Sequence, residues 1–161
     1  MIEIKLGDFN IFLSKRVLSD FVNYKQDKIF KNESGGILLG QVFIKNIYIL
    51  KNSVPCRDDK SKRYSFERDI KNAQKIIDFE FKESEGKTIY LGEWHTHPEK
   101  VPNPSSQDIK MIKEQFEKNI LNEPFIVMII FGTKSFFIGI YNGKKIISKK
   151  ITWIDLYLDD M

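Results

Sequence analysis

Residues 92–98 read Gly-Glu-Trp-His-Thr-His-Pro, and residues 104–108 read Pro-Ser-Ser-Gln-Asp. These two short segments decide how the chain is organised, because the first contains the only two histidines, His95 and His97. Imidazole is the commonest metal ligand among protein side chains. Every imidazole in the sequence is therefore gathered at a single point, which indicates a metal site.

The two histidines follow an expected strand. Residues 88–94 read Thr-Ile-Tyr-Leu-Gly-Glu-Trp, and side chains at i and i+2 of a strand point to the same face. His95 and His97 should therefore project together, about 6–7 Å apart along the strand, a separation that two imidazoles can close around one ion. Three prolines within residues 98–104 then exclude a helix and predict a stiff, extended connection.

A helix should begin at Ser105, because the apolar residues beyond it recur at the spacing of one buried helical face. These residues are Met111, Ile112, Phe116 and Ile120. Asp108 would lie in the first turn, where the helix N-terminus favours a carboxylate. Two neutral imidazoles and a carboxylate, with a fourth position left for water, match the open tetrahedral site of a hydrolytic zinc enzyme.

Each fragment also has a plainer interpretation. Ser105 followed three residues later by Asp108 is a capping-box pattern, and an isolated His-x-His pair is commoner on a surface than in a site. A closed structural zinc site is excluded, because the chain has one cysteine and no third histidine. The two fragments together, seven residues apart, favour the catalytic metal site.

The spacing of these residues resembles the JAMM motif of the JAB/MPN family of zinc isopeptidases. The matching pattern is His95-x-His97, seven residues, and Ser105-x-x-Asp108, with a proline directly after the second histidine. That family also has a glutamate far upstream, just before a Gly-Leu-Leu-Gly-like strand. Residues 33–40, Glu-Ser-Gly-Gly-Ile-Leu-Leu-Gly, are similar to that element.

The resemblance implies a role for each residue of the motif. It makes His95, His97 and Asp108 the ligands of one Zn²⁺ ion, Glu33 the general base, and Ser105 a residue that helps to hold the oxyanion. The chemistry agrees with these roles. A carboxylate must take a proton from the attacking water and pass it to the departing amine, and the developing oxyanion needs a hydrogen-bond donor besides the metal.

Glu93 complicates the choice of the base, because strand alternation puts it on the same face as both histidines. From the residues alone, Glu33 and Glu93 are equally good candidates for the general base. With the resemblance Glu33 is preferred, and Glu93 becomes a candidate partner that orients an imidazole, as metal-bound histidines usually require.

The resemblance also implies an activity, the hydrolysis of the amide bond that links the C-terminus of a ubiquitin-like modifier, or a similarly conjugated protein, to its target. Residues 92–99 are most similar to stand-alone bacterial JAB proteins. Those accompany ubiquitin-transfer-like enzymes in anti-phage operons, including the CBASS type that conjugates a nucleotidyltransferase. In the family an insertion near residues 55–64 contacts the modifier, although a solvated loop is the plainer interpretation. The candidate substrate-binding residues there are Arg57, Lys62, Arg63 and Tyr64.

Other functions fit the residues less well. A zinc peptidase acting on cell-wall or sulfur-carrier peptides is the nearest alternative, since related domains do both. A non-catalytic MPN scaffold would have lost the ligands, all of which are present here. Zinc deaminases need paired cysteines, and the single Cys56 is a poor nucleophile candidate because both histidines are explained as ligands.

The composition predicts a globular protein in the cytoplasm. The chain has 161 residues, 42% hydrophobic and 30% charged, with no apolar run long enough for a membrane span. Residues 1–8 carry charges where a secretion signal needs apolar residues, and one cysteine fits a reducing compartment. A net charge of +4 does not by itself indicate nucleic-acid binding.

The remaining pattern predicts a single α+β domain over residues 1–161, a curved mixed sheet with helices on both sides, which is the JAB/MPN-like (cytidine deaminase-like) fold of the resemblance. Strands are expected at residues 2–13 (as a hairpin), 37–39, 41–43, 47–54, 88–94, 125–131, 135–141 and 145–151. Besides the helix at Ser105, helices are expected from Ser14 to near Asp27 and from Ser65 to Gly86. The second should bury Phe66, Ile70, Ala73, Ile77 and Phe81. The last ten residues should pack back as a helix.

Overall fold

The computed structural model of the protein describes residues 1–152. Its strands are β1 (Ile2–Leu6), β2 (Phe9–Leu13), β3 (Gly35–Phe43), β4 (Asn46–Asn52), β5 (Lys60–Lys62), β6 (Ser65–Glu67), β7 (Ile89–Thr96), β8 (Ile126–Phe131), β9 (Ser135–Tyr141) and β10 (Ile146–Thr152). Its helices are α1 (Lys15–Tyr24), α2 (Ile70–Glu83) and α3 (Ser106–Lys118). The packing expected for the last ten residues concerns a segment that lies almost wholly outside this range.

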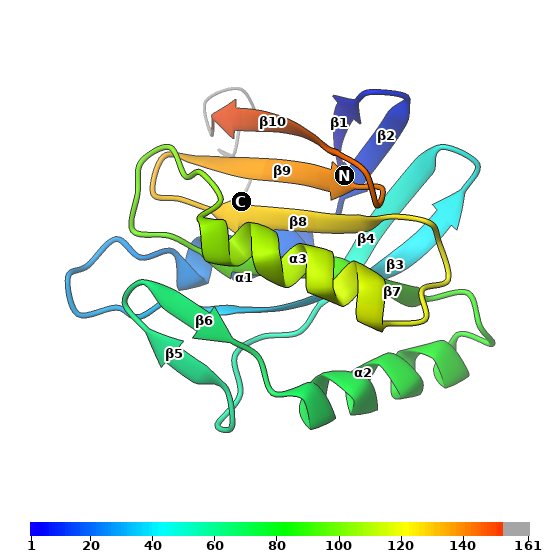
Figure 1. Cartoon of the computed structure of the whole chain (residues 1–161), viewed down its shortest axis with the longest axis horizontal. Coiled ribbons are helices and arrows are strands. Elements are labelled where there is room, and N and C mark those ends of the chain that lie inside the picture. The colour runs from blue at the N-terminus through cyan, green and yellow to red at the C-terminus, as the bar shows by residue number, and fades with distance from the viewer. Residues whose placement is uncertain (153–161) are drawn as a thin grey trace.

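Eight strands form one sheet in the order β1-β2-β4-β3-β7-β8-β9-β10, and β5 pairs with β6 in a separate hairpin. The pairs β2–β4 and β7–β8 are parallel, whereas the other neighbours are antiparallel. Parallel neighbours require a crossover, and α1 and α3 lie within these two crossovers. Figure 1 shows α2 and α3 in front of the sheet and α1 behind it. The predicted mixed sheet with helices on both sides is confirmed.

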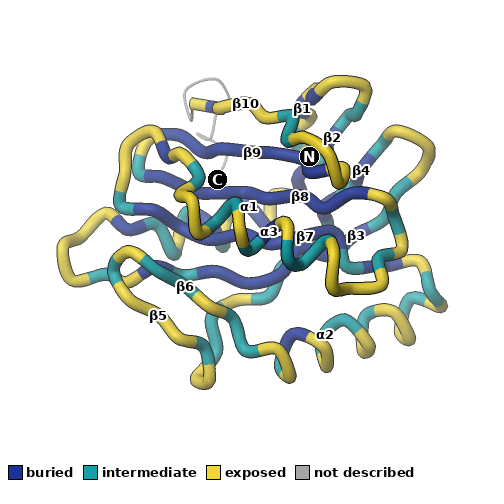
Figure 2. Tube along the Cα trace, viewed as in Figure 1, coloured by how far each residue is buried: buried dark blue, intermediate teal, exposed yellow. Residues whose placement is uncertain are grey.

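The centre of the sheet is buried on both faces. Every residue of β8 and β9 is buried, and Figure 2 shows these strands enclosed between the exposed outer surfaces of the helices and loops. Phe21 of α1 packs against Trp94 of β7, with 4.9 Å between the ring centroids. Burying a side chain of this size stabilises a fold by about 1.5–3 kcal/mol. The strand that leads to both histidines is therefore firmly held.

The apolar faces predicted for the helices from Ser65 to Gly86 and from Ser105 onward are partly wrong. Residues 65–67 form β6, and α2 begins at Ile70, because the side chain of Asp69 caps it by accepting from the backbone N–H of Asn72. Ile70 and Phe81 are exposed, so the stripe is not a continuous core contact. Ile120 is also fully exposed, since α3 ends at Lys118.

Strand pairing gathers the predicted site residues at one end of the sheet. In the antiparallel pair β3–β7, Gly35 lies opposite His95, so Glu33, two residues before β3, reaches the end of β7. The backbone N–H of His97 continues the pairing by donating to the carbonyl of Phe131. Within residues 1–152 no helix combines the length and the apolar character that crossing a membrane would need.

Candidate metal centre

Three side chains converge on one point at the end of β7. Nε2 of His95 lies 3.2 Å from Nε2 of His97, so the two imidazoles point toward each other. The two carboxylate oxygens of Asp108 face them, Oδ1 at 3.2 Å from His95 and Oδ2 at 3.1 Å from His97. Both histidines are buried. The expected convergence of these three residues is therefore present.

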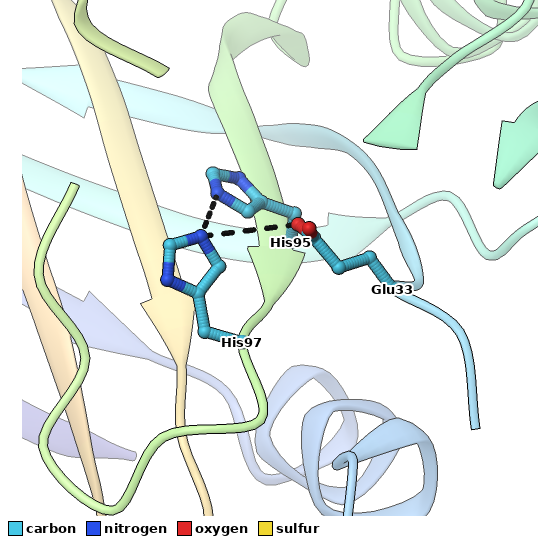
Figure 3. Close-up of side chains that lie close together, drawn as sticks. All are labelled: Glu33, His95 and His97. Atoms are coloured by element: carbon cyan, nitrogen blue, oxygen red, sulfur yellow. Dashed lines mark hydrogen bonds and ion pairs between the residues drawn. The ribbon is translucent and has the colours of Figure 1, made fainter. Parts of the chain in front are cut away.

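Glu33 stands slightly apart from this set. Its Oε1 lies 3.8 Å from Nε2 of His97, too far for a hydrogen bond, and its side chain points toward both imidazoles (Figure 3). The residue is only 3% exposed. Glu33 therefore lies beside the two imidazoles without a hydrogen bond to His97.

The donor set fits a zinc ion. Zinc takes histidine nitrogen and carboxylate oxygen at about 2.0–2.2 Å in tetrahedral geometry, which separates neighbouring ligand atoms by about 3.3–3.6 Å. The separations among His95, His97 and Asp108 are 3.1–3.2 Å. A small contraction of a set without an ion accounts for the difference. Glu33 also lies within metal-binding distance of both imidazoles, but its greater separation from His97 favours Asp108 as the third ligand.

The charges of the two carboxylates respond differently to this environment. Burial opposes ionisation of Asp108, but hydrogen bonds to His95 and His97 outweigh it and hold the pKa of this carboxyl far below its usual range. Burial instead raises the pKa of Glu33 to about 8, and the attraction of His97 only partly opposes it. Asp108 is thus suited to be a permanent anionic ligand, and Glu33 to be a group that exchanges a proton.

Ser105 and Asp108 form a complete capping box at the start of α3. The backbone N–H of Asp108 donates to Oγ of Ser105 at 3.1 Å, and the backbone N–H of Ser105 donates to Oδ2 of Asp108 at 2.8 Å. The capping interpretation and the ligand interpretation are therefore compatible, because one carboxylate serves both. The hydroxyl of Ser105 accepts in this arrangement and keeps its own hydrogen for another partner.

The carboxylate of Glu93 is bonded to residues other than the imidazoles. Its two oxygens accept from Nε of Arg68 and from the hydroxyl of Tyr90, the latter at 2.7 Å. The acid at the outer nitrogen of an imidazole is Glu99, whose Oε1 lies 2.9 Å from Nδ1 of His97. The sequence suggested that Glu93 orients an imidazole. In the structure Glu93 forms an ion pair with Arg68 instead, and Glu99 makes the orienting contact with His97.

A groove of about 880 Å³ runs from Asp108 along α3. The β5–β6 hairpin and α2 form its other wall, and Tyr90 and Glu93 lie between the two walls. Its apolar lining includes Ile77 and Met111. The groove therefore reaches the metal centre at Asp108.

The four predicted substrate-binding residues are placed differently from one another. Tyr64 lines the groove and is exposed, whereas the guanidinium of Arg63 donates to the carbonyls of Lys28 and Ile29 and so has a structural contact. Arg57 and Lys62 are exposed and stay predictions.

Three residues near the centre escaped the sequence analysis, namely Gln26, Arg68 and Glu99. Glu99 could have been found, since it stands two residues after His97 as Glu93 stands two before His95. Gln26 and Arg68 meet their partners only through tertiary packing, so no local pattern marks them.

Comparisons with known proteins agree with the geometry. Residues 14–141 match the family described as prokaryotic homologs of the JAB domain. A protein of Escherichia coli (strain TW11681) named CD-NTase/cGAS isopeptidase is 36% identical over 147 residues, which is 89% of this chain and 91% of the relative. One of the same name from Vibrio cholerae is 30% identical, covering 83% of each chain. A solution structure of a protein from Desulfitobacterium hafniense matches with a TM-score of 0.63 and 16% identity, over 86% of this chain and 89% of that one. The last match shows the fold alone.

Proposed function

This chain belongs to the family of prokaryotic JAB-domain homologues, and we propose that it is a zinc-dependent isopeptidase. The observation that carries the proposal is the convergence of His95, His97 and Asp108, whose donor atoms lie 3.1–3.2 Å apart beside the buried Glu33. The donor atoms of two imidazoles and a carboxylate face one point, as a tetrahedral zinc site with one open position requires.

When bound, zinc supplies a Lewis acid that lowers the pKa of water from about 15.7 to about 7 and polarises a carbonyl oxygen. The remaining steps fall to the chain itself. Glu33 accepts a proton at Oε1 from the attacking water and returns it to the departing amine. The hydroxyl of Ser105 donates to the oxygen on which negative charge develops. Glu99 keeps the ring of His97 in one orientation through Nδ1.

The substrate we propose is a protein joined through its C-terminal carboxylate to a lysine side chain. Relatives that cover most of this chain are named CD-NTase/cGAS isopeptidases. A conjugated CD-NTase nucleotidyltransferase is therefore the first candidate, and a ubiquitin-like modifier is the second. The extended C-terminal tail of either would lie in the groove between α3 and the β5–β6 hairpin. Ubiquitin-transfer-like enzymes would make the bond that this chain removes.

The test uses an isopeptide probe, a CD-NTase whose C-terminal carboxylate is joined to the lysine side chain of a fluorescent peptide. Purified protein should release the peptide, as fluorescence anisotropy reports, and a chelator should stop the release until zinc is restored. Glu33→Gln should keep one zinc per chain and lose turnover by about 10²–10⁴-fold. His97→Ala should lose the zinc as well.

A matched variant separates the two glutamates. Glu93→Gln should keep turnover within about one order of magnitude, because Glu93 is bonded to Arg68 and Tyr90 and to neither histidine. Full activity of Glu33→Gln would exclude Glu33 as the base. Release that continues in a protein shown to be free of metal would overturn the proposal as a whole.

A further inference from the structure

One buried amide joins three segments that surround the metal centre. Gln26 follows the end of α1 and is only 2% exposed. Its Nε2 donates to the carbonyl of Lys31 at 3.2 Å and to the carbonyl of Arg63 at 2.9 Å, and its Oε1 accepts from the hydroxyl of Thr96 at 3.0 Å. Both amide hydrogens and the amide oxygen of Gln26 are thus used.

Thr96 carries these contacts to the ligands, because it stands between His95 and His97 in the sequence and is fully buried. Its hydroxyl accepts from the backbone N–H of Ser34 at 2.9 Å, and its own N–H donates to the carbonyl of Ser34 at 2.9 Å. The residue directly after Glu33 is therefore bonded on both sides to the residue between the two imidazoles.

Glu33 itself lies in a segment without regular structure. Residues 25–34 belong to no helix or strand, so no ladder of backbone hydrogen bonds fixes them. The backbone N–H of Glu33 donates to the carbonyl of Lys62 at 2.7 Å, and its carbonyl accepts from the hydroxyl of Ser61. The position of Glu33 therefore depends on the β5–β6 hairpin, which has only three residues in each strand.

Gln26 is the side chain that ties this arrangement together. It bonds the irregular segment at Lys31, the tip of the hairpin at Arg63, and the ligand strand at Thr96. It lies two residues beyond the end of α1, whose Tyr24 packs near Trp94 with 6.1 Å between ring centroids. An amide is required here, since a carboxylate would set an oxygen against two carbonyl oxygens and an apolar side chain would leave them without a partner.

We propose that Gln26 is a positioning residue for the hydrolysis: it holds the segment that carries Glu33 at a fixed distance from His97. The inference rests on the proposed function, in which Glu33 is the base. A displacement of about 1 Å at a reacting group can cost about 10²-fold in rate. Loss of the amide should therefore act on the catalytic rate rather than on the metal or on substrate binding.

The experiment compares Gln26→Met in the wild-type and Glu33→Gln backgrounds, with the isopeptide probe under single-turnover conditions. In the wild-type background Gln26→Met should lower kcat by about 10–100-fold, leave KM within about 2-fold, and leave one zinc per chain. In the Glu33→Gln background it should lower kcat by less than about 2-fold further, because the group that it positions is already lost. Gln41→Met, the same change far away on β3, should have no effect.

A second pair of variants covers the case in which Gln26→Met does not fold. Thr96→Val removes the hydroxyl that Gln26 and Ser34 share, and Thr96→Ser retains it. Thr96→Val should reproduce the loss of kcat with zinc retained, and Thr96→Ser should restore most of it.

Two results would overturn the inference. One is an equal loss of kcat in both backgrounds, which would show that Gln26 acts independently of Glu33. The other is a loss of zinc in proportion to activity, which would show that Gln26 only supports the ligands. By contrast, full turnover in Glu33→Gln alone would refute the base assignment, so the two failures are distinguishable.

Discussion

Two glutamates beside the metal centre have the same burial and opposite surroundings. Glu33 and Glu93 are each 3% exposed. Glu93 is bonded to the guanidinium of Arg68 and to the hydroxyl of Tyr90, whereas the ion-pair partner of Glu33 within residues 1–152 is His97 at 3.8 Å. A buried carboxylate with a full set of partners stabilises one arrangement of the chain. Burial raises the pKa of both carboxyls, but Arg68 and Tyr90 oppose this at Glu93, whereas at Glu33 only His97 opposes it and the charges of Asp108 and Glu99 add to it.

The strongest test of this contrast removes the cation beside Glu93. Arg68→Met should lower the free energy of unfolding by about 3–5 kcal/mol, because it leaves Glu93 buried without its ion-pair partner. Urea denaturation measures the loss. Adding Glu93→Gln to Arg68→Met should recover most of it. No recovery in the double variant would mean that Arg68 contributes through packing and through its contact with Gln115, and that the ion pair is secondary.

A second test separates the two uses of Ser105. Ser105→Ala should reduce turnover of the isopeptide probe by about 10²–10³-fold and lower stability by about 0.5–2 kcal/mol. Ser105→Asp keeps an N-cap acceptor but cannot donate a hydrogen bond when ionised. It should therefore lose turnover to the same extent and unfold within about 1 kcal/mol of wild type. If Ser105→Asp retained turnover, Ser105 would act only as the N-cap of α3 and not as a hydrogen-bond donor to the oxyanion.

The contact between Glu99 and His97 predicts a smaller effect. Glu99→Ala should weaken zinc binding by about 10-fold, the lower end of the usual range for such partners, because the side chain of Glu99 is half exposed. Competition with a fluorescent chelator measures the affinity. Glu93→Gln is the matched control and should leave zinc affinity unchanged.

The smallest effect concerns the pH dependence of stability in the metal-free protein. Burial raises the folded-state pKa of Glu33 to about 8, above its ordinary value of 4.5. The stability that protonated Glu33 gives is therefore present below pH 4.5 and is lost as the pH rises toward 8. Chelator-treated Glu33→Gln should match the wild-type Tm at pH 4 and exceed it at pH 9 by at least about 2–4 °C, the shift that 1 kcal/mol gives in a domain of this size. A constant difference across this range would contradict the assignment.

Local sequence predicted the parts of the molecule that depend on local spacing. His95 and His97 are two residues apart on a strand, and Ser105 and Asp108 are three apart at a helix start, so periodicity alone places each pair. The distance between the two pairs depends on the proline-rich connection. The short spacing and the use of both histidines favoured their convergence, and the family resemblance added a role for each residue.

Other features depend on contacts between distant residues. The hairpin β5–β6 was missed because Lys60–Lys62 reads Lys-Ser-Lys, which is polar throughout and shows no alternation of apolar and polar residues. The contacts that distinguish Glu93 from Glu33 include the ion pair with Arg68, and those of Gln26 are with Lys31, Arg63 and Thr96. Apart from Lys31, which is five residues from Gln26, these partners lie at least 25 residues away, beyond the range of local periodicity.

The capping box at α3 has a consequence for how such domains change over evolutionary time. Asp108 both starts a helix and faces the two imidazoles, so selection for folding alone gives a reason to keep it. A descendant that abandoned hydrolysis would be free to replace His95 or His97 long before it could discard Asp108. In a related sequence, a retained Ser-x-x-Asp is therefore weak evidence for activity, and a retained histidine pair is stronger evidence.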